Sequence, residues 1–217
     1  MSIKQKTLNK NKLTKLLLIS THLGAIIPGL ILIIKAFMGD LGFNSIQTAT
    51  HWTGRIALTL LLLSLTVTPI KRIFDFTAIN KVRRPLGLYA FLYASIHLGI
   101  FIALDYGFDW DSILQSILQN RFILIGSIAL IILLILAITS YKPLINKLGR
   151  GWKWIHRAVY LAAILILLHF AWAGKGDIFS LQGNIVEPLI ATGALLLLFV
   201  LRIPFVTKGL RKLIGNG

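Results

Sequence analysis

Six apolar runs, each close to the length that crosses a lipid bilayer, constrain this chain more than any other feature of its sequence. They extend over about Leu13–Phe37, Trp52–Ile70, Leu86–Leu104, Phe122–Ser140, Trp154–Trp172 and Glu187–Phe205. A helix needs roughly 20 apolar residues to cross the hydrocarbon core, whereas a membrane-spanning strand alternates apolar and polar side chains. Because the runs are continuously apolar, the sequence predicts an all-α integral membrane bundle of six transmembrane helices.

The basic residues lie in alternate connecting segments. Of the 23 Lys and Arg residues, 19 lie in the N-terminal segment and in the segments that follow the second, fourth and sixth runs. Six of the seven acidic residues fall on the other side, namely Asp40, Asp105, Asp109, Asp111, Asp177 and Glu187. Cytoplasmic loops carry an excess of Lys and Arg, so we expect both termini in the cytoplasm. The net charge of +16 then reflects membrane topology and contact with lipid, not nucleic-acid binding.

The same patterns divide the chain into residues 1–12, a basic cytoplasmic segment, residues 13–205, the transmembrane domain, and residues 206–217, a cytoplasmic tail. Lysines ahead of the first run imitate a signal peptide, but the run is too long and lacks a small-residue cleavage site. We therefore expect a retained first helix. We expect no soluble catalytic domain in a tail of this length, and no internal repeat is evident in the sequence.

Three histidines, His97, His156 and His169, lie inside the apolar runs. An ionisable side chain in the membrane is costly and usually marks a functional site. His156 and His169 share one predicted helix and are 13 residues apart, which is roughly 20 Å of helix, so one metal ion cannot bind both. His97 lies 13 residues after Arg84. The third and fifth helices run in the same direction, and Arg84 and His156 mark their cytoplasmic ends. His97 and His169, each 13 residues further along, are therefore expected at a similar depth.

Two histidines at one depth on neighbouring helices predict the axial ligands of a haem b. The chain has no cysteine, which excludes iron–sulfur clusters and thiolate ligands, so an electron carrier must be held by histidine. The alternative for His97 and His169 is a hydrogen bond between helices. His156 has several roles open to it: ligand of a second haem, partner of a propionate, flavin or quinone head group, or an interfacial residue.

Other polar residues have simpler interpretations. His51 begins the second helix at the outer surface and is expected to be solvated. His22 is expected to pack beside Ser20 and Thr21, with contact to a quinone as the alternative. Arg83 and Arg84 are candidate cofactor-binding residues or topology anchors. Clustered His motifs of di-iron enzymes, intramembrane carboxylates of ion-coupled transporters and nucleotide-binding fingerprints do not occur in the sequence.

Three segments carry a resemblance to a known family. They are TGRIALTLLLLSLTVTPIKR, RRPLGLYAFLYASIHLGIFIALD and LGRGWKWIHRAVYLAAILILLHFAW. In this order and spacing they resemble the MsrQ (formerly YedZ) family of haem-binding membrane subunits, a branch of the ferric-reductase-like transmembrane superfamily. The resemblance covers about residues 52–172, the expected ferric-reductase-like core.

The resemblance implies an electron-transfer subunit, not the catalytic one, in a bacterial inner membrane. Haem b is the family cofactor, and FMN is associated with the family. Electrons would come from the quinone pool or a cytoplasmic flavin reductase. They would pass to MsrP, a periplasmic molybdopterin reductase that forms a heterodimer with the membrane subunit and repairs oxidised methionine. Oxidase members of the superfamily hold two haems with four histidines, whereas here Arg83 and Arg84 stand at the level of the fourth.

Two other functions remain open from the residues. The chain could be a stand-alone membrane haem reductase of ferric chelates or quinones, which would need no partner. It could also be a membrane scaffold without redox activity, whose histidines only join helices. A b-type spectrum of the purified protein separates this last possibility from the other two.

Overall fold

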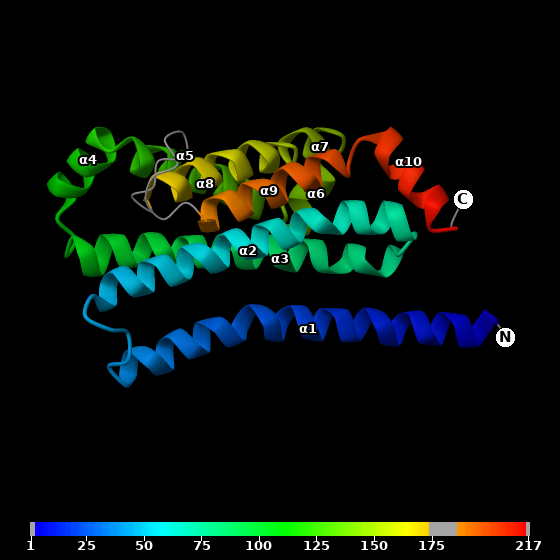
Figure 1. Cartoon of the computed structure of the whole chain (residues 1–217), viewed down its shortest axis with the longest axis horizontal. Helices are drawn as coiled ribbons and strands as arrows, with labels where there is room; N and C mark the ends of the chain where they lie inside the picture. The colour runs from blue at the N-terminus through cyan, green and yellow to red at the C-terminus, as the bar shows by residue number, and fades with distance from the viewer. Residues whose placement is uncertain (1–2, 174–185, 216–217) are drawn as a thin grey trace.

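A computed structural model describes residues 3–173 and 186–215 of the chain (Figure 1). Within these residues every regular element is a helix and no strand occurs. Five helical segments are long and apolar enough to cross a membrane, and a sixth is present if the bent pair near the C-terminus counts as one span. The predicted all-α membrane bundle is therefore confirmed.

The six apolar runs correspond to six long helices or helix pairs. The elements in chain order are α1 (Ile3–Phe37), α2 (Ser45–Phe74), the 3-10 turn η1 (Thr77–Ile79), α3 (Asn80–Ile100), the π-helical turn η2 (Phe101–Asp105), α4 (Trp110–Gln119), α5 (Arg121–Ile138), α6 (Lys142–Leu148), α7 (Gly151–Ile155), α8 (Ala158–Ala173), α9 (Val186–Val200) and α10 (Pro204–Leu213).

The bundle is built around two close helix pairs, α2 with α3 and α5 with α8. Helix α3 also contacts α5, α8 contacts α9, and α1 lies on the outside of the bundle against α3 (Figure 1). Ala90, Ala162 and Ala163 have no exposed surface at all. Small residues let helix backbones approach closely, so these alanines allow close packing of the helices at their positions.

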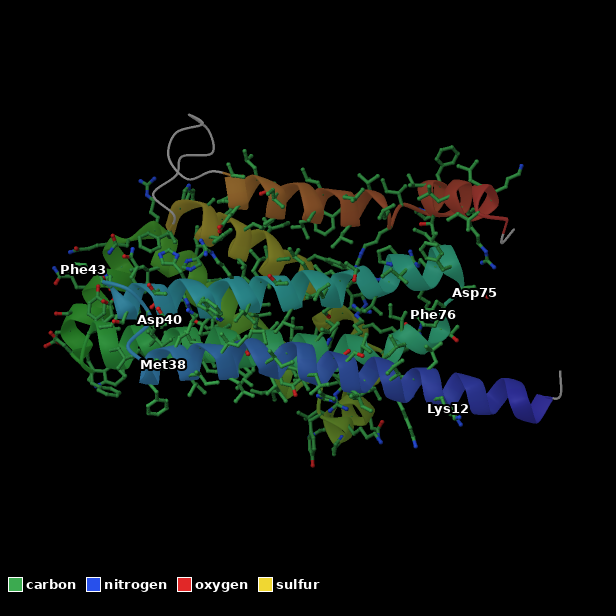
Figure 2. The ribbon with its side chains drawn as sticks, turned by 60° about the horizontal axis from the view of Figure 1, so that its bottom comes forward. Lys12, Met38, Asp40, Phe43, Asp75 and Phe76 are labelled. Carbon is green, nitrogen blue, oxygen red and sulfur yellow. The ribbon has the colours of Figure 1, made fainter. Side chains whose placement is uncertain are left out.

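The start of α1 and the end of α10 lie at the same end of the bundle (Figure 1). The connections with most of the basic residues, between α2 and α3 and between α5 and α8, lie there too, and we call it the basic end. The opposite, acidic end holds the α1–α2 turn, α4 and the start of α9. Figure 2 shows Asp40 and Phe43 at the acidic end and Lys12 and Asp75 at the basic end.

The two ends agree with the predicted separation of charge along the chain. Which end faces the cytoplasm stays a prediction. The predicted outer segment that contains Asp177 lies outside the described residues, as do residues 1–2 and 216–217 of the predicted cytoplasmic segments.

Three details of the helices differ from the expectation. The segment between the third and fourth spans contains a further helix, α4. The predicted fifth helix is interrupted, since α7 ends at Ile155 and α8 begins at Ala158. The sixth run bends by 85° between α9 and α10, where Pro204 lacks the amide hydrogen that a continuing helix needs.

Arg202 fixes this bend to the rest of the bundle. Its guanidinium donates hydrogen bonds to the hydroxyl of Tyr160 on α8 and to the main-chain carbonyl of Leu65 on α2. The guanidinium also lies over the ring of Tyr160, 4.8 Å from its centre. One side chain therefore joins the α9–α10 turn to both helix pairs.

Candidate functional site

His97 of α3 and His169 of α8 face each other across the bundle. Their ring centres are 6.0 Å apart and the ring planes are nearly perpendicular, at 89°. Metal–imidazole bonds are about 2 Å long, so two imidazoles on opposite sides of one metal ion hold their ligating nitrogens about 4 Å apart, with the ring centres somewhat further away. The structure thus brings together the two histidines that the depth argument pairs, at a separation that suits a shared metal ion.

Each of these rings is bound to the main chain of a neighbouring helix. Nδ1 of His97 lies 2.9 Å from the carbonyl oxygen of Thr50 on α2, and Nδ1 of His169 lies 2.8 Å from the carbonyl oxygen of Phe122 on α5. A carbonyl can only accept, so Nδ1 donates in both rings. Nε2 then carries the lone pair, which is the form in which imidazole binds a metal.

Both rings line a cavity of about 430 Å³ between α2, α3, α5 and α8, close to the acidic end. We call it the acidic-end cavity. Its inner wall is formed by small and aliphatic side chains: Ala57, Leu58, Ala94, Ala129, Leu130 and Leu133. Ligand pockets of this size are typically apolar with a few placed polar groups, and this one offers two ligating nitrogens.

The mouth of the acidic-end cavity is polar. His51 and Arg55, four residues apart on one face of α2, both line it. Arg55 forms an ion pair with Glu187 at the start of α9, with 2.9 Å between Nη2 and Oε2. The expectation that His51 is simply solvated is therefore wrong in part: it is half-buried at the cavity rim, because α2 begins at Ser45, earlier than the apolar run suggests.

His156 lies apart from this pair. It stands at the break between α7 and α8, where Nε2 is 3.2 Å from the hydroxyl of Thr139. The ring of Trp152 packs on it, with 4.2 Å between the ring centres, and the indole of Trp152 donates to the carbonyl of Thr139. These contacts place His156 near the basic end of the bundle.

Arg83 and Arg84 meet His156 around a second cavity of about 300 Å³, which we call the basic-end cavity. Asn80, Ser64 and Ser140 add neutral polar groups to the lining. The side chain of Leu133 lines both cavities. The sequence-predicted site residues thus divide into two groups, with His97 and His169 in one cavity and Arg83, Arg84 and His156 in the other.

His22 belongs to neither cavity. Its Nδ1 is 2.9 Å from the hydroxyl of Tyr89 on α3, and the two rings meet edge to face. This contact joins α1 to α3, but the ring is exposed and its partner is Tyr89, not Ser20 or Thr21 as expected.

The chain matches the family model described as ferric reductase like transmembrane component over residues 53–167. It is also similar to three curated proteins named protein-methionine-sulfoxide reductase heme-binding subunit MsrQ. That of Ralstonia nicotianae is 34% identical over 89% of this chain and 88% of its own length. That of Rhodospirillum rubrum is 40% identical over 76% of each chain. That of Herminiimonas arsenicoxydans is 37% identical over 71% of this chain and 72% of its own length.

The chain belongs to the MsrQ family. This membership and the apolar helices make it a multi-pass membrane protein with a ferric-reductase-like core. The matched family segment includes His97 and His156 and ends two residues before His169. The MsrQ resemblance of the sequence is thereby confirmed.

Sequence reasoning missed several groups at the acidic-end cavity of this MsrQ family member. They are the carbonyls of Thr50 and Phe122, the glycines Gly54 and Gly126, and the polar pair His51 and Arg55. Main-chain carbonyls carry no side-chain signal, and a glycine inside an apolar run is indistinguishable from one that only aids packing. The i, i+4 spacing of His51 and Arg55 is the one signal that could have marked a polar helix face.

Proposed function

We propose that this chain is the membrane electron-transfer subunit of a protein-methionine-sulfoxide reductase system, with one haem b held between His97 and His169. The observation that carries the proposal is the facing pair of imidazoles, both with Nδ1 bound to a carbonyl and Nε2 left for a metal. The printed names of the three relatives, which describe heme-binding subunits, support the same cofactor.

The residues of the acidic-end cavity fit a haem. Its walls are apolar where a macrocycle would lie, and Arg55 and His51 stand at the mouth, where carboxylates would meet water. Gly54 and Gly126 leave room beside the two imidazoles. When bound, haem b supplies reversible one-electron transfer. The chain's own residues would orient the two imidazoles through the carbonyls of Thr50 and Phe122, and Arg55 would offer a cation at the rim.

We further propose that electrons arrive at the basic end and leave at the acidic end of the bundle. The donor is the quinone pool or a cytoplasmic flavin reductase, and the acceptor is the periplasmic molybdopterin reductase MsrP, bound as a heterodimer in a bacterial inner membrane. The charge pattern supports this direction, because a surface rich in Lys and Arg favours the cytoplasmic side and attracts an acidic flavoprotein. The His97–His169 pair lies closer to the acidic end.

The basic-end cavity is proposed as the site where electrons are received. Arg83 and Arg84 can pair with an anionic group, and His156 can bind or hydrogen-bond to a redox cofactor. A second haem, a flavin such as FMN, or a quinone head group all have the polar or anionic atoms that these residues would recognise. The family resemblance alone suggests FMN.

The proposed ligands are tested with single His→Ala variants of the purified protein. We expect the wild type to show a low-spin b-type spectrum on reduction, and His97→Ala and His169→Ala each to lose that haem, because each variant lacks one of the two imidazoles that would hold it. His22→Ala is the matched control, since His22 lies outside both cavities, and it should keep the haem. Full six-coordinate low-spin haem in both cavity variants would overturn the assignment.

A further inference from the structure

The two candidate ligands are held by the same local arrangement, built twice. In each case Nδ1 of the histidine bonds to a carbonyl 47 residues earlier in the chain, on the neighbouring helix. Four residues after that carbonyl stands a glycine that faces the ring: Gly54 follows Thr50, and Gly126 follows Phe122. Imidazole, carbonyl and glycine therefore form one structural unit on α2 with α3, and another on α5 with α8.

The space at these glycines is occupied by the imidazoles. A Cβ built on Gly126 would lie 2.6 Å from Nδ1 and 2.9 Å from Cε1 of His169. A Cβ built on Gly54 would lie 3.3 Å from Nδ1 and Cε1 of His97. In a helix the Cα–Cβ bond leans toward the N-terminus, so a side chain at either position would point to the level of the carbonyl, where the ring is bound.

The repetition extends over most of the lining of the acidic-end cavity, although residues such as Asp105, Tyr106 and Asn120 have no lining counterpart. The second unit follows the first by 72 positions: Thr50 corresponds to Phe122, Gly54 to Gly126 and His97 to His169. Further pairs of lining residues are also 72 positions apart, including Ala57 with Ala129, Leu58 with Leu130 and Leu98 with Phe170. Four of these six pairs are identical in residue type, and only Thr50 with Phe122 and Leu98 with Phe170 differ. The cavity is therefore a site made of two corresponding halves, each contributing one imidazole.

Residues of the basic-end cavity also correspond at a separation of 72 positions, but they do not form the unit of imidazole, carbonyl and glycine. Leu61 and Leu133 correspond there, and the counterpart of His156 is Arg84. His156 contacts the side-chain hydroxyl of Thr139 instead of a carbonyl beside a glycine. The imidazole, carbonyl and glycine unit thus belongs to the acidic-end cavity alone among the described residues.

We propose that Gly54 and Gly126 are positioning residues for the two axial histidines. The absence of a side chain lets each imidazole lie against the adjacent helix, so that Nδ1 reaches the carbonyl and Nε2 is directed to the shared metal ion. The proposal rests on the haem-binding function given above. It also predicts unequal halves, because the contact at Gly126 is much closer than the contact at Gly54.

The test compares Gly126→Ala and Gly54→Ala with Gly99→Ala in the full-length chain purified with its cofactor. Gly99 lies on α3, two residues from His97, and a Cβ there meets nothing within 4 Å. We expect Gly126→Ala to weaken haem affinity on the order of 10- to 100-fold, as is typical when the bond that orients a metal-binding histidine is lost. Gly54→Ala should lose less haem, and Gly99→Ala should match the wild type.

The electron paramagnetic resonance signal of the low-spin iron is the second readout, because it reports the orientation of the imidazole planes and not the stability of the fold. It should shift in both cavity variants and not in Gly99→Ala. Haem affinity and signal of Gly126→Ala that equal those of Gly99→Ala would overturn the inference. Absence of haem from the wild type and Gly99→Ala would instead refute the proposed function.

Circular dichroism and size-exclusion chromatography check that each variant is folded. Should Gly126→Ala not fold, the series Gly54→Ala and Gly54→Val decides the question. The proposal requires haem affinity to fall and the signal to move progressively as the side chain grows. An unchanged signal and haem content in both Gly54 variants would overturn it.

Discussion

The three membrane histidines differ in the atom that each offers to its cavity. In His97 and His169 the nitrogen Nδ1 is committed to a carbonyl, so Nε2 is available. In His156 it is Nε2 that lies near a hydroxyl, that of Thr139, and the ring is covered on one face by Trp152. His156 is therefore suited to a different task from that of the facing pair.

Replacement of His156 should separate these tasks. We expect His156→Ala to slow reduction by a donor at the basic end while leaving the haem proposed between His97 and His169 largely in place, because the two sites are distinct cavities. Stopped-flow reduction by a quinol, together with haem content, measures both effects, and His22→Ala is the control. Equal loss of haem in His97→Ala, His156→Ala and His169→Ala would show that the wrong rings have been paired.

The N-terminus of helix α4 is capped by a side chain that can titrate. Asp109 precedes it, and its carboxylate accepts hydrogen bonds from the amide of Ser112 at 3.2 Å and from the hydroxyl of Ser112 at 2.6 Å. These bonds lower the pKa of Asp109 below its ordinary value. The cap therefore stabilises α4 fully above the unfolded-state pKa of about 4, and the stabilisation is lost as the pH falls through the lower folded-state pKa.

We accordingly expect α4 to open more readily as the pH falls below about 4, where the Asp109 carboxylate takes up a proton. Hydrogen exchange of the α4 amides, corrected for the intrinsic pH dependence, measures this opening. Asp109→Asn keeps a capping oxygen that does not titrate, so its α4 should respond less to pH. The same pH response in both proteins would show that another group controls the helix.

The packing of α8 depends on side chains of minimal size. Ala163 has no exposed surface, so Ala163→Leu must displace the neighbouring helices, and we expect it to destabilise the protein by roughly 1–3 kcal/mol. Ala36→Leu on the exposed side of α1 adds the same atoms without a neighbour to displace. Thermal unfolding in detergent compares the two variants, and equal stability would mean that the α8 interface can expand freely.

The two charged ends of the bundle predict its orientation in the membrane. The sequence has no cysteine, so single cysteines introduced as Asp111→Cys at the acidic end and Asn146→Cys at the basic end can be labelled selectively. Because basic loops stay in the cytoplasm, we expect a membrane-impermeant maleimide to label only Asp111→Cys in intact cells and both variants after permeabilisation. The reverse pattern would invert the topology and the proposed direction of electron flow.

Vesicles that contain the purified protein test the molecule as an electron conduit. With a reduced quinone or a flavin reductase supplied, reduction of the bound haem should proceed without any partner. Methionine sulfoxide should be consumed only after a periplasmic molybdopterin reductase is added, because the described helices provide ligands for electron carriers and the substrate chemistry is assigned to the partner. Sulfoxide turnover without it, or efficient reduction of ferric chelates alone, would favour a stand-alone reductase.

The sequence by itself determined the all-helical membrane architecture, the separation of basic from acidic ends and the pairing in depth of His97 with His169. These features depend on apolar length, charge and helical rise, which are local properties of the chain. Only the tertiary structure decided that Thr50 and Phe122 supply the carbonyls, that Gly54 and Gly126 make room for the rings, and that His51 and Arg55 face the cavity. Each of those depends on which helices are neighbours and on how they are rotated, and continuously apolar runs specify neither.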